Sequence, residues 1–408
     1  SVWLDWSPRY FHSVEEPDWQ PDYIVKTPEE LKRLIGELEE KCREKRELLR
    51  RVNGKIHKMV EAFTGILYET DDIFLKNMES NNLAGDDIAR YRYWEWTQGV
   101  GLFGLWKLFC YEKKDSYLDT LKKYYDRQIA IGFPALNVNT AAPYLTMSFL
   151  AEYTGEEKYL KPCIAAAEEI MESFPRTKEG GFQHKTSDSV NEEELWDDTL
   201  YMTVLFLANM GRILKNEKMK AEAEYQFLLH DKYLSDRTTG LWYHGWSFRE
   251  KNHFAGAFWG RGNCWITMAI PEFLAIQDCS EPVRRMLTNT LRAQIESLQK
   301  YQEPNGMWHT LVDDGDSYVE ASATCGFAYG ILKAVKDGLA DRSCLETAVK
   351  AAAPILDYIS REGVVNQVSY GTPMGRTSRD FYKEIQLKPM PYGQALAILF
   401  LMEYRTVL

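Results

Sequence analysis

The stretch Leu195-Trp-Asp-Asp-Thr-Leu-Tyr-Met202 places two adjacent acids directly after a tryptophan, at the start of an apolar run that continues to Ala208. Apolar side chains recur through this run at three- and four-residue spacing, which predicts a helix packed into a core. Asp197 and Asp198 then lie near a helix N-terminus, where an acid can cap the helix and favour its macrodipole. This structural role would explain either acid alone, so a chemical role has to be argued from the rest of the chain.

The pattern around this stretch repeats along most of the sequence. From about residue 53 onward, amphipathic segments of helical period alternate with loops rich in Gly, Trp, Asn and His, and alternating strand patterns are confined to short pieces such as Leu241–His244. Paired helices of this number predict an all-α fold, an (α/α)6 barrel of six helical hairpins whose loops converge on a central pocket at one end. The expected helices are 53–69, 96–112, 115–130, 141–153, 156–173, 198–214, 217–234, 261–276, 280–301, 320–336, 343–360 and 391–406.

The N-terminal segment has a different composition. Residues 1–26 are rich in Trp, Pro and Asp and are expected to form an irregular arm. Thr27-Pro28-Glu29-Glu30 then predicts a helix start, with Thr27 as N-cap, Pro28 in the first helical position and Glu30 completing a capping box. We therefore expect residues 1–50 to be an arm and helix packed on the barrel, and residues 51–408 to be the barrel domain.

Composition limits the classes of partner. The 408 residues are 45% hydrophobic, which is enough for a large core, and the net charge of -11 argues against a nucleic-acid partner. No apolar run reaches membrane-spanning length, so no membrane partner is expected. Seven scattered cysteines without a C-x-x-C pair indicate reduced thiols in a cytoplasmic protein. The N-terminus lacks a signal-peptide pattern, and the periplasm is the alternative if a leader was removed.

Almost all Trp and His residues fall in the predicted loops. Aromatic and hydrogen-bonding side chains in loops that converge on a pocket are typical of a carbohydrate site, because sugars stack their apolar faces on rings. Arg261 stands between two glycines, where a guanidinium can clamp a carboxylate. Trp94 and Trp96 are open to a core interpretation, and His244 is equally consistent with a structural turn and a pocket residue.

Signatures of several other enzyme classes are absent from the sequence. There is no G-x-G-x-x-G after a strand, no P-loop, no H-x-x-x-H or cysteine cluster, and no G-x-S-x-G nucleophile elbow. The chain is therefore expected to use carboxylate-based acid/base chemistry, with no cofactor and no metal.

Several loop motifs together resemble a known family. Trp196-x-Asp198-Thr-Leu-Tyr-Met, His244-Gly-Trp246 and Trp259-Gly-Arg-Gly-Asn-x-Trp265 are similar, in matching order, to the unsaturated glucuronyl and rhamnogalacturonyl hydrolases of glycoside hydrolase family 105. The resemblance extends from Tyr91 to Tyr404 and includes Asn137-Val-Asn-Thr-Ala-Ala-Pro143. It implies an (α/α)6 barrel that acts on an oligosaccharide ending in a 4,5-unsaturated uronic acid.

The resemblance also implies a mechanism and a set of site residues. An acid protonates C4 of the unsaturated sugar, water adds at C5, and the hemiketal opens to release the aglycone; the acid/base of the Trp-x-Asp-Thr motif is here Asp198. His184-Lys185 resembles a His-Lys pair whose lysine lies near the uronate carboxylate. The residues expected to bind the sugar are Trp94, Asn139, His184, Lys185, Trp196, His244, Trp246, Trp259, Arg261 and Trp265.

One position departs from the family pattern. Relatives often carry an aspartate in the loop where this chain has Asn139, and a carboxylate role there would pass to Asp197 or Glu95. Three other functions stay open at this point. They are an inverting glycosidase with two separated carboxylates, a sugar epimerase using His184 and His244, and a noncatalytic sugar-binding protein. The sequence leaves the parent polysaccharide and the oligomeric state open.

Overall fold

The computed structural model describes residues 2–4, 21–69 and 72–408. The chain divides into two compact units, Ser1–Gly54 with Leu408, and Lys55–Val407. In the first unit, strands β1 (Val2–Leu4) and β2 (Tyr23–Val25) pair in parallel. The irregular arm expected over residues 1–26 falls largely on residues outside the described ones, and the packing of residues 1–50 on the barrel stays a prediction.

Helix α1 (Pro28–Ile66) begins where the sequence predicts. The Thr27 hydroxyl accepts a hydrogen bond from the Glu30 N–H, and the Glu30 carboxylate accepts one from the N–H of Lys26. The break expected near residue 53 was wrong, because α1 continues through Gly54 to Ile66. A single glycine costs a helix only about 1 kcal/mol, which the packing of the following turns offsets.

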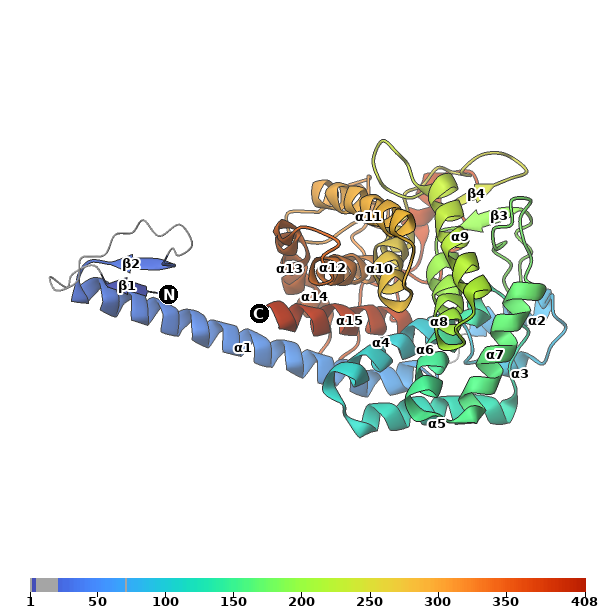
Figure 1. The fold of residues 1–408 in the computed structure, drawn as a ribbon, viewed down its shortest axis with the longest axis horizontal. Helices are drawn as coiled ribbons and strands as arrows, with labels where there is room; N and C mark the ends of the chain where they lie inside the picture. Colours follow the sequence, from blue (N-terminus) through green and yellow to red (C-terminus); the bar gives the residue numbers. More distant parts are fainter. Residues whose placement is uncertain (1, 5–20, 70–71) are drawn as a thin grey trace. The chain divides into compact units, whose positions relative to one another are not determined.

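Six inner helices form a closed ring within residues 72–408. Each packs on the next in chain order, and the last packs on the first. These helices are buried nearly all round, as their mostly apolar sequences require. Figure 1 labels them: α4 (Trp96–Glu112), α6 (Val138–Thr154), α8 (Leu205–Ile213), α10 (Gly260–Ile276), α12 (Ala321–Lys336) and α15 (Pro391–Val407).

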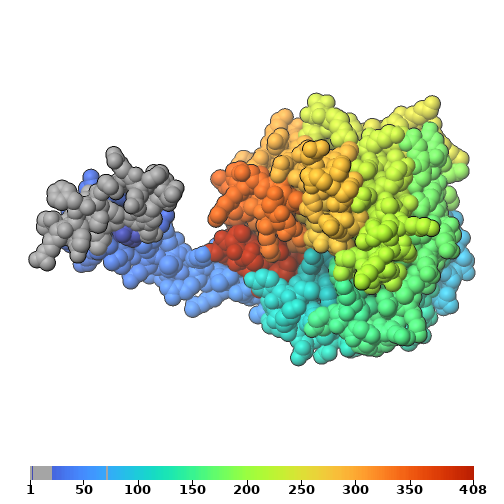
Figure 2. All heavy atoms as spheres, in the orientation of Figure 1, coloured from blue at the N-terminus to red at the C-terminus, as the bar shows by residue number. Residues whose placement is uncertain are grey.

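Amphipathic outer helices cover the ring. In α11, for example, a buried stripe includes Val283, Leu287, Leu291 and Ile295, while the other face is charged. On the face shown in Figure 2, helices such as α7 and α9 form the surface of this unit. The outer helices are α5 (Asp115–Ile131), α7 (Glu157–Glu172), α9 (Glu217–Leu234), α11 (Glu281–Tyr301), α13 (Leu345–Lys350), α14 (Ala352–Tyr358) and residues 55–66 of α1. The predicted all-α (α/α)6 barrel is confirmed.

Long connections lie before the N-termini of the inner helices. They contain α2 (Asp72–Asn81), which the sequence analysis missed, α3 (Ile88–Tyr91) and the short turn η3 (Arg379–Glu384), whereas the turn η2 (Arg342–Cys344) connects α12 to α13. They also contain β3 (Glu194–Trp196) and β4 (Gly245–Ser247), which pair antiparallel. No helix among the described residues has the length and apolar character that a membrane span needs.

Candidate active site

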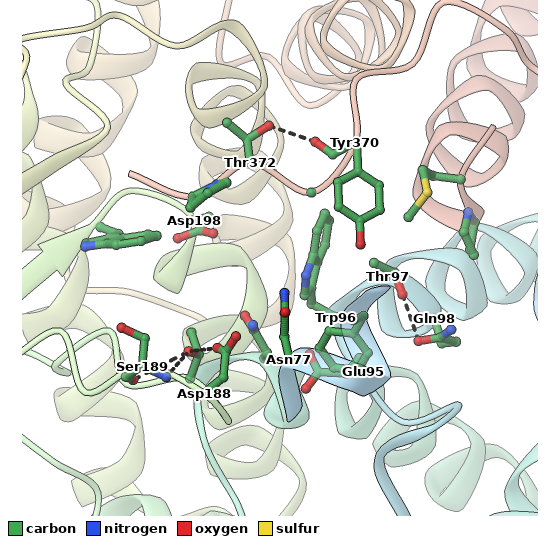
Figure 3. A pocket seen from close by; sticks show the side chains of 18 of the residues that line it. Asn77, Glu95, Trp96, Thr97, Gln98, Asp188, Ser189, Asp198, Tyr370 and Thr372 are labelled. Atoms are coloured by element: carbon green, nitrogen blue, oxygen red, sulfur yellow. Dashed lines mark hydrogen bonds between the residues drawn. The ribbon is translucent and has the colours of Figure 1, made fainter. Parts of the chain in front are cut away.

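A cavity of about 420 Å³ opens among these connections. Its walls include the starts of α4, α6, α10 and α15 and the segment that precedes α8. The positive ends of several helix dipoles therefore point toward one space, which favours an anionic ligand in a chain of net charge -11. Figure 3 shows Asp198, Glu95, Asp188 and Tyr370 around this cavity, each on a different segment.

Asp198 reaches the cavity because the helix predicted at 198–214 starts in an unusual way. Its first turn, Leu200–Val204, is π-helical, with the N–H of Leu205 bonded to the carbonyl of Leu200, and α8 follows. The Asp198 carbonyl accepts bonds from the N–H groups of Tyr201 and Met202 at 3.0 and 2.9 Å. The acid is thus fixed at the end of a wide turn, a form that is frequent at functional sites.

Burial sets the protonation of Asp198. Its side chain is 16% exposed and its Oδ1 is buried without a hydrogen-bond partner. Loss of hydration raises the pKa of Asp198 from 3.8 to about 7, an effect that the positive charge of Arg261 partly offsets. The group therefore carries a proton in part of the population at neutral pH, as a general acid must.

His184 is the nearest titratable neighbour of Asp198. Its Nδ1 lies 3.4 Å from Asp198 Oδ1 and 2.9 Å from the Thr199 hydroxyl, with which it hydrogen bonds. Burial lowers the pKa of His184 to about 3, so the ring is neutral and the contact with Asp198 is not an ion pair. The imidazole lies flat on Trp196, with ring centroids 4.1 Å apart, and so holds the wall beside the acid.

Asp197 points away from the cavity into the protein. It is fully buried, and neither carboxyl oxygen has a hydrogen-bond partner. Burial, and then the neighbouring Asp198 charge, raise the pKa of Asp197 well above its ordinary value, so it is neutral. Gly262 gives it room, because a Cβ there would lie 2.2 Å from Asp197 Oδ2.

Six of the predicted site residues line the cavity. They are Asn139, His184, Trp196, Asp198, Trp259 and Trp265. Trp196 is held by a bond from its indole N–H to Glu194 at 2.9 Å, and Glu194 in turn pairs with Arg376, another lining residue. The roles of these side chains toward a sugar stay predictions.

The position of Trp94 in the structure corrects the expectation that it lines the sugar site. It is fully buried, donates its indole N–H to the Thr140 carbonyl at 3.0 Å, and packs against a cluster of aromatic rings that includes Tyr124 and Tyr144. The ring that lines the cavity is Trp96, two residues later. The sequence alone could not show which of the two tryptophans faces the cavity, because the helix begins only at residue 96 and helical periodicity therefore does not relate their directions.

Trp246 is also placed away from the cavity, for a reason of strand geometry. It pairs with Leu195 across β3 and β4, whereas Trp196 pairs with Gly245 on the next register position. Successive strand residues face opposite sides, so Trp196 faces the cavity and Trp246 does not. Trp246 packs instead against a cluster that contains Leu195 and Phe248.

His244 and Lys185 are absent from the cavity lining as well. His244 lies behind two lining tryptophans, with ring centroids 5.2 Å from Trp196 and 4.3 Å from Trp259, and its Nδ1 hydrogen bonds with the Tyr382 hydroxyl at 2.6 Å. Burial lowers its pKa well below the ordinary value. Lys185 is partly buried, and its carbonyl accepts the N–H of Val138 at the start of α6.

Arg261 binds a loop of the protein and is not placed to bind a substrate carboxylate in the cavity. It is buried and donates to the carbonyls of Ser369 and Tyr370 at 2.9 and 3.0 Å and to the Thr372 hydroxyl at 2.9 Å. Tyr370 and Thr372 line the cavity, so the arginine shapes its wall. The cations that do line it are Arg92, Arg376 and Lys388.

Other lining residues gave little signal in the sequence. Asn77 lies on the unpredicted helix α2, and Asp188 lies in the loop after His184. Glu95 lines the cavity too and is 4% exposed. Among residues 2–4, 21–69 and 72–408, no cluster of three or more His, Cys, Asp or Glu has an arrangement that would hold a metal ion.

Known proteins match this chain over most of its length. The profile of Glycosyl Hydrolase Family 88 matches residues 70–408. The chain belongs to this family. "Unsaturated rhamnogalacturonyl hydrolase YesR" of Bacillus subtilis is 32% identical over 311 residues, which cover 76% of this chain and 88% of YesR.

Solved structures agree with the assignment. A protein from Salmonella enterica serovar Paratyphi A, described as a possible member of the GH105 family, is 42% identical, with a TM-score of 0.80 over 87% of this chain and 94% of the other. An unsaturated glucuronyl hydrolase from Bacillus sp. GL1 shares the fold at 16% identity, with a TM-score of 0.62 over 85% of this chain and 96% of the other. The family resemblance drawn from the loop motifs is confirmed.

Proposed function

We propose that the protein removes a 4,5-unsaturated uronic acid from the non-reducing end of lyase-generated oligosaccharides, by hydration of the vinyl ether double bond. The proposal is supported by membership of family 88 and by the names of the relatives, which are unsaturated uronyl hydrolases. The observation that carries it at the site is Asp198, a buried carboxyl with a pKa of about 7 on the wall of an aromatic cavity.

Asp198 performs both proton transfers in this mechanism. Its neutral carboxyl delivers the proton to C4, and the double-bond electrons form the new C–H bond while positive charge develops at C5. The resulting carboxylate then accepts a proton from water as the water oxygen bonds to C5. The hemiketal opens by breaking the bond between C5 and the ring oxygen, and the hemiacetal left at C1 releases the aglycone.

The surrounding groups prepare this reaction. Because His184 is neutral, it places no positive charge against Asp198, which keeps the proton affinity of Asp198 high. The rings of Trp196 and Trp259 supply apolar faces for the sugar. We propose that the uronate carboxylate is held by Arg376, the lining cation that ties Glu194 and Asn191 into the same wall.

An inverting glycosidase is the alternative within the enzymes. It needs a second carboxylate, ionised at working pH, to activate water. Glu95 is a second buried acid on the cavity, and burial raises its pKa to about 8, so it is protonated at neutral pH and is not a base. Asp188 also lines the cavity and is the remaining candidate for that base. The double-bond mechanism is favoured because the relatives are named as unsaturated uronyl hydrolases.

The test is a panel of unsaturated disaccharides that begins with a rhamnogalacturonan-derived substrate, as the name of YesR suggests. Loss of the double-bond ultraviolet absorbance reports turnover, and in heavy water deuterium should appear at C4. The saturated analogue should be inert. Efficient cleavage of that analogue would overturn the proposal in favour of the ordinary glycosidase.

For the cellular setting we propose the cytoplasm, supported by seven cysteines that are all free. Fractionation of the source cells with an antibody to the protein tests this, and recovery in the periplasmic fraction would contradict it.

A further inference from the structure

Glu95 is a buried acid on the cavity wall that the proposed mechanism leaves unused. It is the residue before α4, yet its side chain makes no capping bond to that helix. It is 4% exposed, and its Oε1 is 3.0 Å from the Ser187 hydroxyl. Its Oε2 is buried and has no hydrogen-bond partner in the protein. Figure 3 shows the side chain beside Asn77 and Trp96, on a segment different from that of Asp198.

The hydrogen bonds around Ser187 fix where the proton of Glu95 lies. The Asn137 side-chain oxygen accepts from the N–H groups of Asn139 and Thr140, so its amide nitrogen faces Ser187 and donates to the serine hydroxyl at 2.8 Å. The one proton of that hydroxyl is then directed at Glu95 Oε1. Because Oε1 is an acceptor, a neutral Glu95 carries its proton on Oε2, the atom without a partner.

The charges around Glu95 favour the neutral form. Burial raises its pKa to about 8, the hydrogen bond from Ser187 and the nearby Trp96 N–H oppose this, and the negative charge of Asp188 adds to it. Tyr91, behind Glu95, is neutral, since burial raises its own pKa to about 12. The other titratable and charged groups that line the cavity are Glu69, Arg92, His184, Asp198, Tyr370, Arg376 and Lys388.

We infer that Glu95 is a substrate-binding residue that acts in its neutral form, donating a hydrogen bond from Oε2 to a hydroxyl group of the bound sugar. A neutral hydroxyl is the partner, rather than a uronate carboxylate, because Asp188 lies on the same wall and repels an anion. Trp96, adjacent in the chain and also lining the cavity, offers that sugar an aromatic face. The inference rests on the proposed function.

The pH dependence of kcat/KM separates this role from a structural one. In the wild type both Asp198 and Glu95 must be protonated, so log kcat/KM should fall with a slope of about -1 above pH 7 and about -2 above pH 8. In Glu95→Gln the amide donates at every pH, so the second bend should disappear. At pH 9 the fall of the wild type from its maximum should be roughly tenfold larger than that of the variant.

The matched control is Glu69→Gln, which removes a carboxylate from the exposed edge of the same cavity and should leave both bends in place. Glu95→Ala removes the donor and should raise KM by roughly tenfold at pH 6.5, with kcat changed less. A loss of about a hundredfold in Glu95→Gln at every pH would mean that the carboxylate is needed, and wild-type KM in Glu95→Ala would mean that no contact is made. Either result overturns the inference.

A measurement without substrate keeps this inference apart from the proposed function. Carbon-13 labelling of glutamate carboxyls gives a resonance that is missing in Glu95→Gln, and its titration midpoint should be near 8 rather than 4.5. A midpoint near 4.5 rejects a neutral Glu95 even if the enzyme is active. If no disaccharide in the panel is cleaved, the proposed function fails, and calorimetric binding of the same disaccharides to wild type and Glu95→Ala then decides whether Glu95 contacts a sugar.

Discussion

Asp198→Asn should produce an enzyme that is far less active and yet more stable at neutral and alkaline pH. The folded protein holds the Asp198 proton up to a pKa of about 7, whereas an ordinary aspartate, like one in the unfolded chain, releases it near 3.8. Between these values the folded state binds more protons, so the free energy of unfolding falls as pH rises. A shift of three units corresponds to roughly 4 kcal/mol above pH 7. Asparagine carries no ionisable proton and escapes this cost.

Chemical denaturation at two pH values measures the effect. At pH 5 the expected advantage of the variant is about 1–2 kcal/mol and at pH 8 about 4 kcal/mol. The decisive quantity is the increase in this advantage between the two pH values, roughly 2–3 kcal/mol, because any packing change caused by the amide is the same at both. Turnover should meanwhile fall by about 10²–10⁴-fold, because the proton donor is lost.

Asp197→Asn is the internal control for activity, since Asp197 is sealed from the cavity and its variant should lose much less turnover. An advantage of Asp198→Asn that stays constant or shrinks with rising pH would refute the burial argument. A correctly folded Asp198→Asn protein with near wild-type turnover would refute the catalytic assignment.

Three further substitutions test other parts of the site. Gly262→Ala should lower turnover and cost about 1–3 kcal/mol in a thermal melt, because its Cβ would lie 2.2 Å from Asp197 Oδ2; unchanged values for both would show that the site can relax. Arg376→Ala should raise KM about 3–10-fold, a modest effect because the side chain is 47% exposed. Lys185→Ala should raise KM less, because it removes a cation that does not line the cavity. The opposite order would mean that Lys185 binds the uronate carboxylate. Trp94→Phe should destabilise the fold by about 1–3 kcal/mol and leave KM unchanged, since it breaks the bond to the Thr140 carbonyl; a raised KM would restore the original assignment.

The barrel was predictable because its physical cause is visible in the sequence. An inner helix such as α4 is apolar on nearly every side and an outer helix such as α11 on one stripe, so the pattern alone separates the two layers. The ends of helices were harder to predict where no strong helix-breaking or capping residue marks them. The continuation of α1 through Gly54 and the π-helical start at Leu200 depend on packing that a single sequence does not record.

The candidate site was predictable where a motif fixes the local geometry. His184 stacks on Trp196 and its Nδ1 lies 3.4 Å from Asp198 Oδ1, and all three residues line the cavity. The misplaced residues share one cause, since the face that a loop residue presents depends on register. Trp94 and Trp96 differ by two positions before a helix begins, and Trp196 and Trp246 occupy alternate positions of a strand pair that only tertiary contacts define.

Ring closure also has a consequence for synthesis. Helix α15 is in close contact with α4, which joins the last of the six inner helices to the first. A Cβ on Gly104 of α4 would lie 2.9 Å from the Cβ of Ala395 on α15. Residues just before α15, such as Lys388 and Met390, complete the cavity that Glu95 and Asn139 began. A nascent chain emerging from the ribosome therefore carries Asp198, the proposed acid, long before it has a complete cavity, and we expect activity only after α15 has been translated.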